Sequence, residues 1–330
     1  MKIGCIGAGS WGTTLAVYLA RNGHDVLLWA HSDEQREALR RDRENSRYLP
    51  DVKFPESITV VDSVTDAVAE CIVVATPTQF IRNTVQPLAD ADLSGSLFVN
   101  TSKGIERKTL LRVSQILCET TGVTPDRVVT LSGPSHAEEV SRDDPAALVA
   151  AGSSIESAGI AQELFNSETL RIYRSEDIVG VELGGALKNV IALCAGIVDG
   201  LEFGDNTKAA LITRGLAEIT RLGVGMGARP ETFSGLSGLG DLIVTCTSRH
   251  SRNRYVGEQI GVGRKLDEIV AEMKMVAEGV STTESAWELA RRAGVEMPII
   301  NEVHKVLFEG KDTREAINDL MNRSTKREHW

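Results

Sequence analysis

The pattern of apolar and polar positions divides the chain into two parts. In the first part, short apolar runs rich in β-branched residues alternate with stretches whose apolar positions recur at helical spacing. Such alternation is typical of βαβ units and predicts a mostly parallel sheet. The predicted strands are Ile3–Ile6, Val26–Ala30, Ile58–Val61, Ile72–Ala75, Leu97–Asn100, Val128–Leu131, Ala146–Ala150 and Leu170–Tyr173.

The second part, from about Asp177 onward, has helical periodicity instead. One apolar helix face is formed by Ala209, Ile212, Leu216, Ile219 and Leu222. The segment Ser281–Glu284 has the form of a capping box, which predicts the start of a helix that ends near Gly294. We therefore expect an α/β domain over residues 1–180 and an all-helical domain over residues 181–330, packed closely together.

Charge and cysteine content narrow the possible partners. A formal net charge of −10 disfavours nucleic acid and anionic membranes. The five cysteines lie far apart without a Cys-x-x-Cys pair, so we expect free thiols in a reducing, cytoplasmic compartment. The long apolar stretch Val181–Val198 contains three polar side chains and is predicted to be a buried helix, not a membrane span.

A glycine-rich turn follows the first predicted strand. Gly7, Gly9 and Gly12 form a Gly-x-Gly-x-x-Gly motif between that strand and a helical pattern that begins at Thr13. In this context the glycines allow a tight turn, close approach of a pyrophosphate and packing of helix against strand. The start of the helix adds free N–H donors. We therefore predict a Rossmann-type dinucleotide site, the alternative being a turn without a ligand.

The end of the second predicted strand bears on the choice between NAD and NADP. An NAD site usually has a carboxylate there, which bonds the ribose hydroxyls. Here the position holds His31, with Asp33 and Arg36 nearby. The guanidinium of Arg36 would attract a 2′-phosphate, although a solvated helix residue explains it equally well, so both cofactors stay open.

Three later strands run into polar segments. They are Thr76-Pro77, Thr101-Ser102-Lys103-Gly104 and Ser132-Gly133-Pro134-Ser135. Ligands of open α/β sheets bind beyond the carboxyl ends of the strands. Each segment alone would be ordinary turn chemistry, but three at one sheet edge beside a dinucleotide turn favour a functional site.

The helical part holds three further candidates. Lys188 lies in an apolar helix, where burial would lower the pKa of its amine, or from which its side chain would snorkel to solvent. Asp241 follows a glycine turn and could hold that lysine, bind a substrate hydroxyl or cap a helix. The segment Ser251–Arg254 is either a phosphate site at a helix start or a solvated basic turn.

The histidines give no indication of a metal site. His24, His136, His250, His304 and His329 share no ligand spacing. We expect each of them to be structural or exposed.

With these segments identified, the chain closely resembles the bacterial NAD(P)-dependent glycerol-3-phosphate dehydrogenases. The resemblance spans nearly the whole chain in order. Its most specific part is the combination of the segments Gly184–Asn189, Gly240–Thr247 and Ser251–Arg254. The matching segments are Gly7–Thr13, Ser102–Gly104, Ser132–Glu139, Val181–Ala192, Ala210–Glu218, Ser237–Cys246, Ser251–Arg254 and Ala277–Gly279.

The resemblance implies interconversion of sn-glycerol 3-phosphate and dihydroxyacetone phosphate, which supplies phospholipid synthesis, by a cytoplasmic homodimer. The implied cofactor contacts are Ser10, Trp11, His31, Lys103, Ala137, Arg252, Val276 and Glu278. The implied substrate contacts are Lys103, Gly133, Ser135, Asp241, Ser251, Arg252 and Asn253, with Lys188 as the proton acceptor. Many members have a basic residue where this chain has Ser32, which leaves the preference between NAD and NADP open.

Two other functions compete with this one. Another dehydrogenase with a helical second domain, acting on a hydroxy acid or a hydroxyacyl thioester, would prefer a carboxylate or thioester to a phosphate. A non-catalytic NAD(P)-sensing protein would need only the first domain. The joint presence of Lys188, Asp241 and the basic segment Ser251–Arg254 speaks against the sensor.

Overall fold

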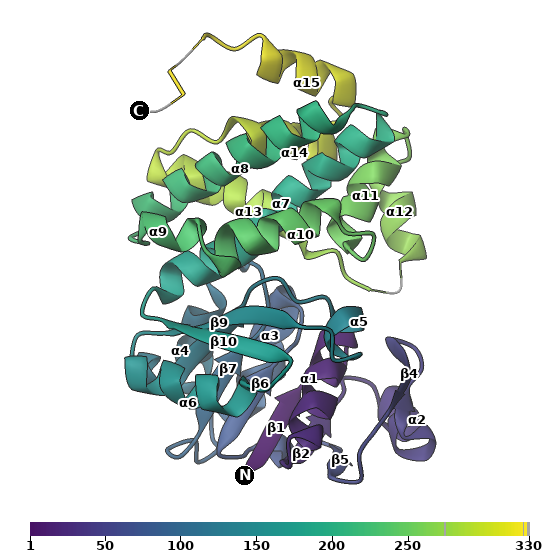
Figure 1. Cartoon of the computed structure of the whole chain (residues 1–330), viewed down its shortest axis with the longest axis vertical. Helices are drawn as coiled ribbons and strands as arrows, with labels where there is room; N and C mark the ends of the chain where they lie inside the picture. Colours follow the sequence, from purple (N-terminus) through teal and green to yellow (C-terminus); the bar gives the residue numbers. More distant parts are fainter. Residues whose placement is uncertain (274, 326, 329–330) are drawn as a thin grey trace.

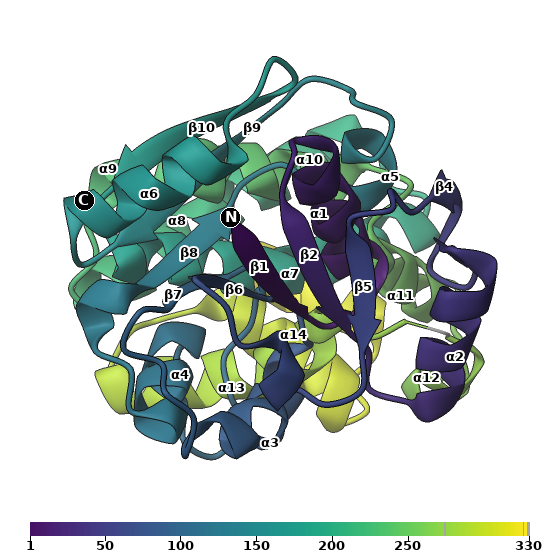
Figure 2. The ribbon, with the colours of Figure 1, turned by 90° about the horizontal axis from the view of Figure 1, so that it is seen from below.

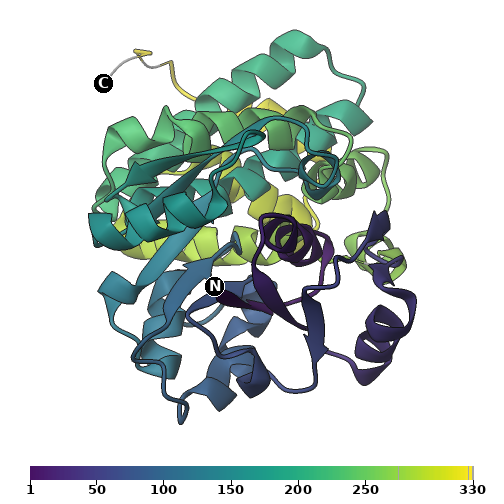
Figure 3. The same cartoon turned by 60° about the horizontal axis from the view of Figure 1, so that its bottom comes forward.

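The computed structural model describes residues 1–273, 275–325 and 327–328. A sheet half contains the N-terminus, and a helical half is stacked on it along the long axis of the molecule (Figure 1). Figure 3 shows the same stacking from another side, with the helical half above the sheet. The predicted class, a sheet domain followed by helices, is confirmed.

Among the described residues, eight strands form one sheet that follows the order β10-β9-β8-β7-β6-β1-β2-β5, and Figure 2 shows them fanning out from β10 to β5. Neighbouring strands are parallel except for β8 and β9, which are antiparallel. The strands are β1 (Lys2–Ile6), β2 (Asp25–Trp29), β5 (Ile58–Val61), β6 (Cys71–Val74), β7 (Leu97–Asn100), β8 (Val128–Ser132), β9 (Ala146–Gly152) and β10 (Leu170–Ser175). The order reverses between β1 and β6, the place where open parallel sheets bind their ligands.

Helices cover both faces of the sheet, which explains why its strands read as continuous apolar runs. In β6, Cys71 and Val73 belong to one apolar cluster, together with residues of α1 and α6, whereas Ile72 and Val74 belong to another with residues of α3 and α4. The helices of this half are α1 (Ser10–Arg21), α2 (Asp33–Asp42), α3 (Ile81–Val85), α4 (Val113–Thr121), α5 (Ala137–Val140) and α6 (Ile155–Phe165).

One small antiparallel pair lies outside the sequence prediction. It consists of β3 (Glu44–Asn45) and β4 (Leu49–Lys53). Its strands are short and mostly polar, and Pro50 interrupts the second, so hydrophobic periodicity carries no signal there.

The helical half is built around α7 (Ile178–Gly200), most of whose residues are buried. Around it lie α8 (Asp205–Gly225), α9 (Pro230–Phe233), α10 (Asp241–Thr247), α11 (Arg252–Gly261), α12 (Leu266–Glu272), α13 (Glu278–Ala293), α14 (Pro298–Phe308) and α15 (Thr313–Met321). Strands end at Ser175, so the predicted division at 180/181 falls inside the first turn of α7 and stays a prediction. By length and composition α7 alone among the described helices could cross a membrane, but 89% of its apolar window is buried inside the fold.

Glycines let α11 pack directly on α7. A Cβ at Gly196 would overlap the carbonyl oxygen of Arg254, and one at Gly257 would overlap the carbonyl oxygen of Leu193. This close approach fixes the start of α11 beside the middle of α7, where Lys188 lies.

The predicted start of α13 is wrong. The segment Ser281–Glu284 lies within the helix, which begins at Glu278. The hydroxyls of Ser281 and Thr283 donate to the carbonyl oxygens of Glu278 and Gly279, so they bond back along the helix instead of capping it. The predicted end is confirmed, because Gly294 is the left-handed C-cap.

Candidate active site

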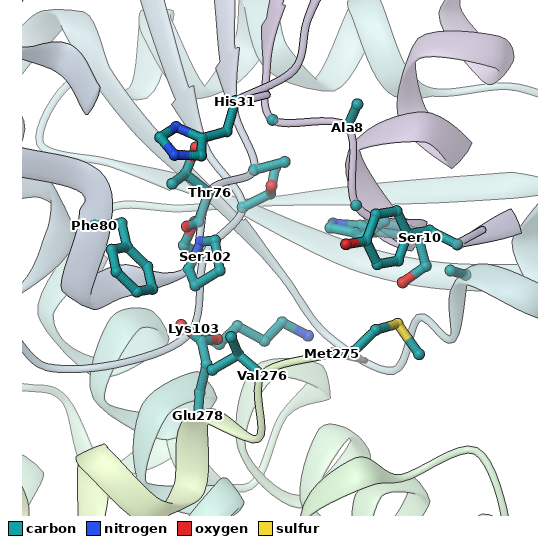
Figure 4. Close-up of a pocket in the computed structure, with 18 of the residues that line it drawn as sticks. Ala8, Ser10, His31, Thr76, Phe80, Ser102, Lys103, Met275, Val276 and Glu278 are labelled. Atoms are coloured by element: carbon teal, nitrogen blue, oxygen red, sulfur yellow. The ribbon is translucent and has the colours of Figure 1, made fainter. Parts of the chain in front are cut away.

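A cavity of about 1120 Å³ lies between the two halves. Its floor includes the segments that follow β1, β2, β5, β6, β7 and β8, and its roof includes residues from α7, the start of α11 and the loop before α13. Figure 4 shows Ala8 and His31 of the floor facing Met275 and Val276 of the roof. Every cofactor and substrate contact implied by the resemblance except Gly133 and Asp241 lines this cavity, as do Gly7 and Gly9 of the glycine turn but not Gly12. The cavity therefore unites both halves of the predicted site.

The glycine turn forms the cavity wall at the start of α1. Gly7 has a φ of +112°, which L side chains rarely adopt, and a Cβ at Gly9 would meet no atom within 4 Å. No side chain caps α1 at Gly9, so first-turn N–H groups remain free for an anion. A pyrophosphate fits this cradle. Gly12 lies behind the turn, where a Cβ would overlap the carbonyl oxygen of Gly7.

At the end of β2, His31 and Arg36 line the same wall. The side chain of Arg36 is only 11% exposed, so the expectation of a solvated helix residue is wrong. Its Nη1 donates to the carbonyl oxygens of Ala30 (2.6 Å) and His31 (3.1 Å), and the guanidinium pairs with Asp33. Arg36 therefore holds the turn after β2 in place beside the cavity.

Lys103 extends from the loop after β7 toward the helical half (Figure 4). Its Nζ donates to the carbonyl oxygen of Gly133 at 3.0 Å and to Oδ2 of Asp241 at 2.7 Å. Gly133 and Asp241 thus lie just behind the lining and fix the direction of this lysine.

Lys188 is buried and does not snorkel to solvent. Its Nζ donates to Oδ1 of Asp241 and to the hydroxyl of Thr245, the latter at 2.8 Å. Burial, aided by the nearby charge of Lys103, lowers the pKa of Lys188 to about 8, against the opposing effect of Asp241. An amine with this pKa can serve as proton donor or acceptor near neutral pH.

Asp241 joins the two lysines. It is the first residue of α10, and its side chain is 1% exposed. Burial acts to raise the pKa of its carboxyl, but the ammonium groups of Lys103 and Lys188 together hold that pKa below its ordinary value. The interpretation that Asp241 holds Lys188 is confirmed.

A chain of amides ties these groups to the rest of the helical half. Asn189 donates to the carbonyl oxygen of Lys103 at 3.0 Å, and Asn253 donates to Oδ1 of Asn189 at 2.9 Å. The N–H of Gly279 donates to Oδ1 of Asn253 at 2.9 Å. These bonds fix the orientation of the Asn253 side chain, whose amide nitrogen has a second N–H beside the backbone N–H at the start of α11.

The basic segment forms the start of α11. Ser251 is its N-cap and accepts from the N–H of Arg254 at 3.2 Å, as its sequence position predicts. Arg252 is exposed and lines the cavity, whereas Arg254 pairs with Asp199 at 2.6 Å and does not line it. Among the described residues the guanidinium of Arg252 has no ion-pair partner, so it can meet an anion.

The loop before α13 contributes Val276, and the first residue of α13 contributes Glu278. Figure 4 shows Val276 and Met275 on the opposite side of the cavity from His31. Oε1 of Glu278 accepts from the N–H and the hydroxyl of Thr78, both at 2.8 Å, and so links the two halves. This bond from Thr78 was not predicted, because nothing in the sequence connects positions 200 residues apart.

Several residues in or beside the cavity wall escaped prediction. His136 and His250 line the cavity, a position that the sequence analysis did not predict for them. His329 lies outside the described residues, within which no group of three or more potential metal ligands occurs. Thr245 could have been found, because it lies one helical turn after Asp241. The other unpredicted lining residues include Asn83, Thr84, Pro87, Asn189 and Met275.

Comparisons with known proteins agree over the whole chain. Residues 2–158 match the family described as NAD-dependent glycerol-3-phosphate dehydrogenase N-terminus, and residues 177–318 match the corresponding C-terminus. The glycerol-3-phosphate dehydrogenase (NAD(P)+) of Chlorobium phaeobacteroides is 57% identical over 100% of both chains. That of Salinibacter ruber is 50% identical over 100% of this chain and 96% of its own.

A solved structure extends the agreement to the fold. The glycerol-3-phosphate dehydrogenase of Coxiella burnetii superposes with a TM-score of 0.93 at 34% identity and covers 98% of this chain and 99% of its own. With both family models and full-length relatives in agreement, the chain belongs to the NAD-dependent glycerol-3-phosphate dehydrogenase family.

Proposed function

We propose that this protein is an NAD(P)-dependent oxidoreductase that interconverts sn-glycerol 3-phosphate and dihydroxyacetone phosphate. The observation that carries the proposal is the buried Lys188–Asp241–Lys103 cluster, which lies in one cavity with the glycine turn and the basic start of α11. Family membership supports phospholipid synthesis as the use of the product. Residues 1–180 are proposed to bind the dinucleotide and residues 181–330 to complete the substrate site.

The dinucleotide is assigned to the wall that continues from the sheet. The N–H groups at Ser10 and Trp11 would face its pyrophosphate, with Gly9 giving the room for close approach and Gly7 allowing the tight turn. His31 would lie at the adenosine ribose, and Ala137 and Val276 at other parts of the cofactor. When bound, the nicotinamide supplies or accepts the hydride.

Lys188 is assigned as the acid and base. Reduction of the ketone places negative charge on its oxygen, which the ammonium of Lys188 would stabilise and protonate. In the oxidative direction the neutral amine would take the proton of the hydroxyl. Asp241 and Thr245 hold the amine in position, and Lys103 adds a second positive charge at the same oxygen.

The start of α11 is assigned to the phosphate. Arg252 offers a free guanidinium, and the backbone N–H groups near Ser251 and Asn253 point from a helix N-terminus. Binding the phosphate there would orient the C2 carbon of the substrate toward Lys188. Binding energy from the phosphate would in this way increase the rate of the reaction at C2. Ser135, on the facing loop, would contact the remainder of the substrate.

The proposal is tested by following NADH and NADPH oxidation separately with dihydroxyacetone phosphate, pyruvate, acetoacetyl-CoA and unphosphorylated dihydroxyacetone. We expect turnover with the phosphorylated ketone and poor turnover with the other three. A preference for the 2-keto acid or the thioester would establish the rival dehydrogenase. Binding of the dinucleotide without turnover of any of these substrates would favour the sensing protein.

Two further features of the proposal come from the family resemblance. We assign the protein to the cytoplasm as a homodimer; the five cysteines, all unpaired thiols, fit a reducing compartment. Light scattering of the purified protein with and without NADH would measure the mass, and a monomer under both conditions would contradict the dimer.

A further inference from the structure

Two imidazole rings, one from each half of the molecule, meet at the cavity wall. His136 is the N-cap residue of α5, and His250 lies in the turn between α10 and α11. Their ring centroids are 5.8 Å apart, the planes are inclined by 52°, and both residues line the cavity. The mechanism above assigns neither ring a role.

The environment of His136 points to a ligand. Its Nε2 is buried and has no hydrogen-bond partner among the described residues, a condition that folded proteins rarely tolerate without a reason. Burial first, and then the charges of Lys188 and Lys103, lower the pKa of His136, while Glu138 and Glu139 act in the opposite direction. The ring is therefore neutral at pH 7 in the free protein.

The pair is flanked by the proposed substrate contacts. Ser135 precedes His136, and Ser251 and Arg252 directly follow His250. A phosphate bound at the start of α11 would therefore lie next to the two rings. It would add negative charge to a wall whose cations are Lys103, Lys188 and Arg252, with Asp241 buried behind the two lysines.

We propose that His136 and His250 recognise the phosphate group of the substrate as a dianion and take up a proton from solvent when it binds. This inference rests on the proposed function and adds the ionisation state of the bound ligand to it. The dianion offsets the repulsion that Lys188 and Lys103 exert on His136 and so raises the affinity of the pair for a proton. The proton comes from the buffer and is shared within the pair, and no covalent step is involved.

Calorimetry measures this proton directly. Glycerol 3-phosphate is titrated at pH 7 into the complex of the protein with NADH, a pair of reduced ligands that cannot react. The titration is repeated in buffers with different heats of ionisation, so the slope of heat against ionisation heat counts the protons. We expect uptake of about half a proton or more per site.

Substitution then assigns the proton to the pair. Each of His136→Gln and His250→Gln keeps a hydrogen-bonding side chain but removes one imidazole of the pair, so each should reduce the uptake to near zero. Between pH 6 and 8 each should also flatten the rise in KM for dihydroxyacetone phosphate while kcat changes less than about two-fold. The matched control is His24→Gln, remote from the cavity in the turn after α1, which should behave as the wild type.

The outcomes separate the two proposals. Turnover of dihydroxyacetone phosphate with no proton uptake by the wild type, or with equal uptake in both histidine variants, would overturn the role of the pair and leave the proposed function intact. Absence of both turnover and glycerol 3-phosphate binding would remove the proposed function and this inference with it. Thermal melting shows which variants fold, and one folded variant is enough. If neither folds, the wild-type uptake decides, and it must be present between pH 6.5 and 7, where Lys188, with its pKa of about 8, already carries its proton.

Discussion

The two walls of the cavity, one formed by the sheet half and the other by the helical half, use different chemical groups to form the site. The wall that continues from the sheet uses backbone, because Gly7 allows a tight turn against Ala75, Gly9 leaves open space at the start of α1, and no side chain caps the first-turn N–H groups at Gly9. The opposite wall uses buried charge, with Lys188 in the lining and Asp241 packed behind it, where it is bonded to Lys103 of the first half. A backbone site depends on local chain geometry, whereas a site of buried charges depends on contacts between distant segments. The two walls should therefore fail differently when they are altered.

The largest effect is expected from Lys188→Met, which keeps the length of the side chain and removes its charge and proton. Asp241 keeps Lys103 as its partner, so the buried carboxylate stays paired and folding should survive. Turnover should fall by about 10²-fold or more, because proton transfer and stabilisation of the oxyanion are lost together. NADH should still raise the melting temperature, since the first wall is untouched.

The pH dependence of the wild type sharpens this prediction. With a pKa of about 8 for Lys188, ketone reduction should decline as the pH rises through 8, and glycerol 3-phosphate oxidation should increase over the same range. Lys188→Met should lose this inflection from kcat. Lys208→Met, which removes a lysine paired with Asp199 outside the cavity, should keep it. A folded Lys188→Met protein with near-normal kcat would exclude Lys188 as the acid and base.

The next effect concerns the phosphate. Arg252→Ala should raise KM for dihydroxyacetone phosphate by about 10- to 100-fold, as expected when one charged partner of an ion pair is removed. Unphosphorylated dihydroxyacetone should be a poor substrate of both proteins, with little difference between them. Arg254→Ala serves as the control on the same helix, because its guanidinium pairs with Asp199 outside the cavity. An equal loss on both substrates would contradict the assignment of the phosphate to Arg252.

The difference between the walls also describes what the sequence could predict. The bounds of β5 and β7 and the glycine turn were predicted correctly, because alternating apolar runs and glycine spacing are local signals. The contact of Lys103 with Asp241 was not predicted, since 138 residues separate them. The same holds for His136 and His250, whose only signal is their meeting in space. The helix start predicted at Ser281 was wrong because a hydroxyl at that spacing can either cap a helix or donate to a carbonyl oxygen of the preceding turn.

A smaller effect is expected from Glu218, a buried carboxyl group that lies outside the cavity. Glu218 of α8 accepts from the N–H groups of Ile299 (2.8 Å) and Ile300 (3.4 Å) at the start of α14, and burial raises its pKa to about 7. The folded state thus holds a proton that the unfolded state releases above its own pKa of about 4.5. This contribution to stability is complete below pH 4.5 and is lost as the pH rises through 7.

Urea unfolding between pH 5 and 7 measures that loss. Glu218→Gln should flatten the decrease in the free energy of unfolding over this interval. Glu288→Gln should leave it unchanged, because the pKa of Glu288, held near 2 by bonds from Arg291 and Arg292, lies outside the interval. A slope that is the same in Glu218→Gln and the wild type would show that Glu218 does not titrate there.

The smallest effect should come from Arg36, at the edge of the cavity wall that the sheet half forms. Its guanidinium is bonded to the carbonyl oxygens of Ala30 and His31 and balanced by Asp33, so only part of its charge acts on a ligand. Arg36→Ala should raise KM for NADPH a few-fold more than KM for NADH, because only NADPH carries a 2′-phosphate. Arg40→Ala, on the same helix but paired with Asp62 and outside the lining, should change neither constant. If Arg36→Ala weakened both cofactors equally, Arg36 would serve only to hold the turn after β2, and the choice between NAD and NADP would have to be made by other groups of that wall.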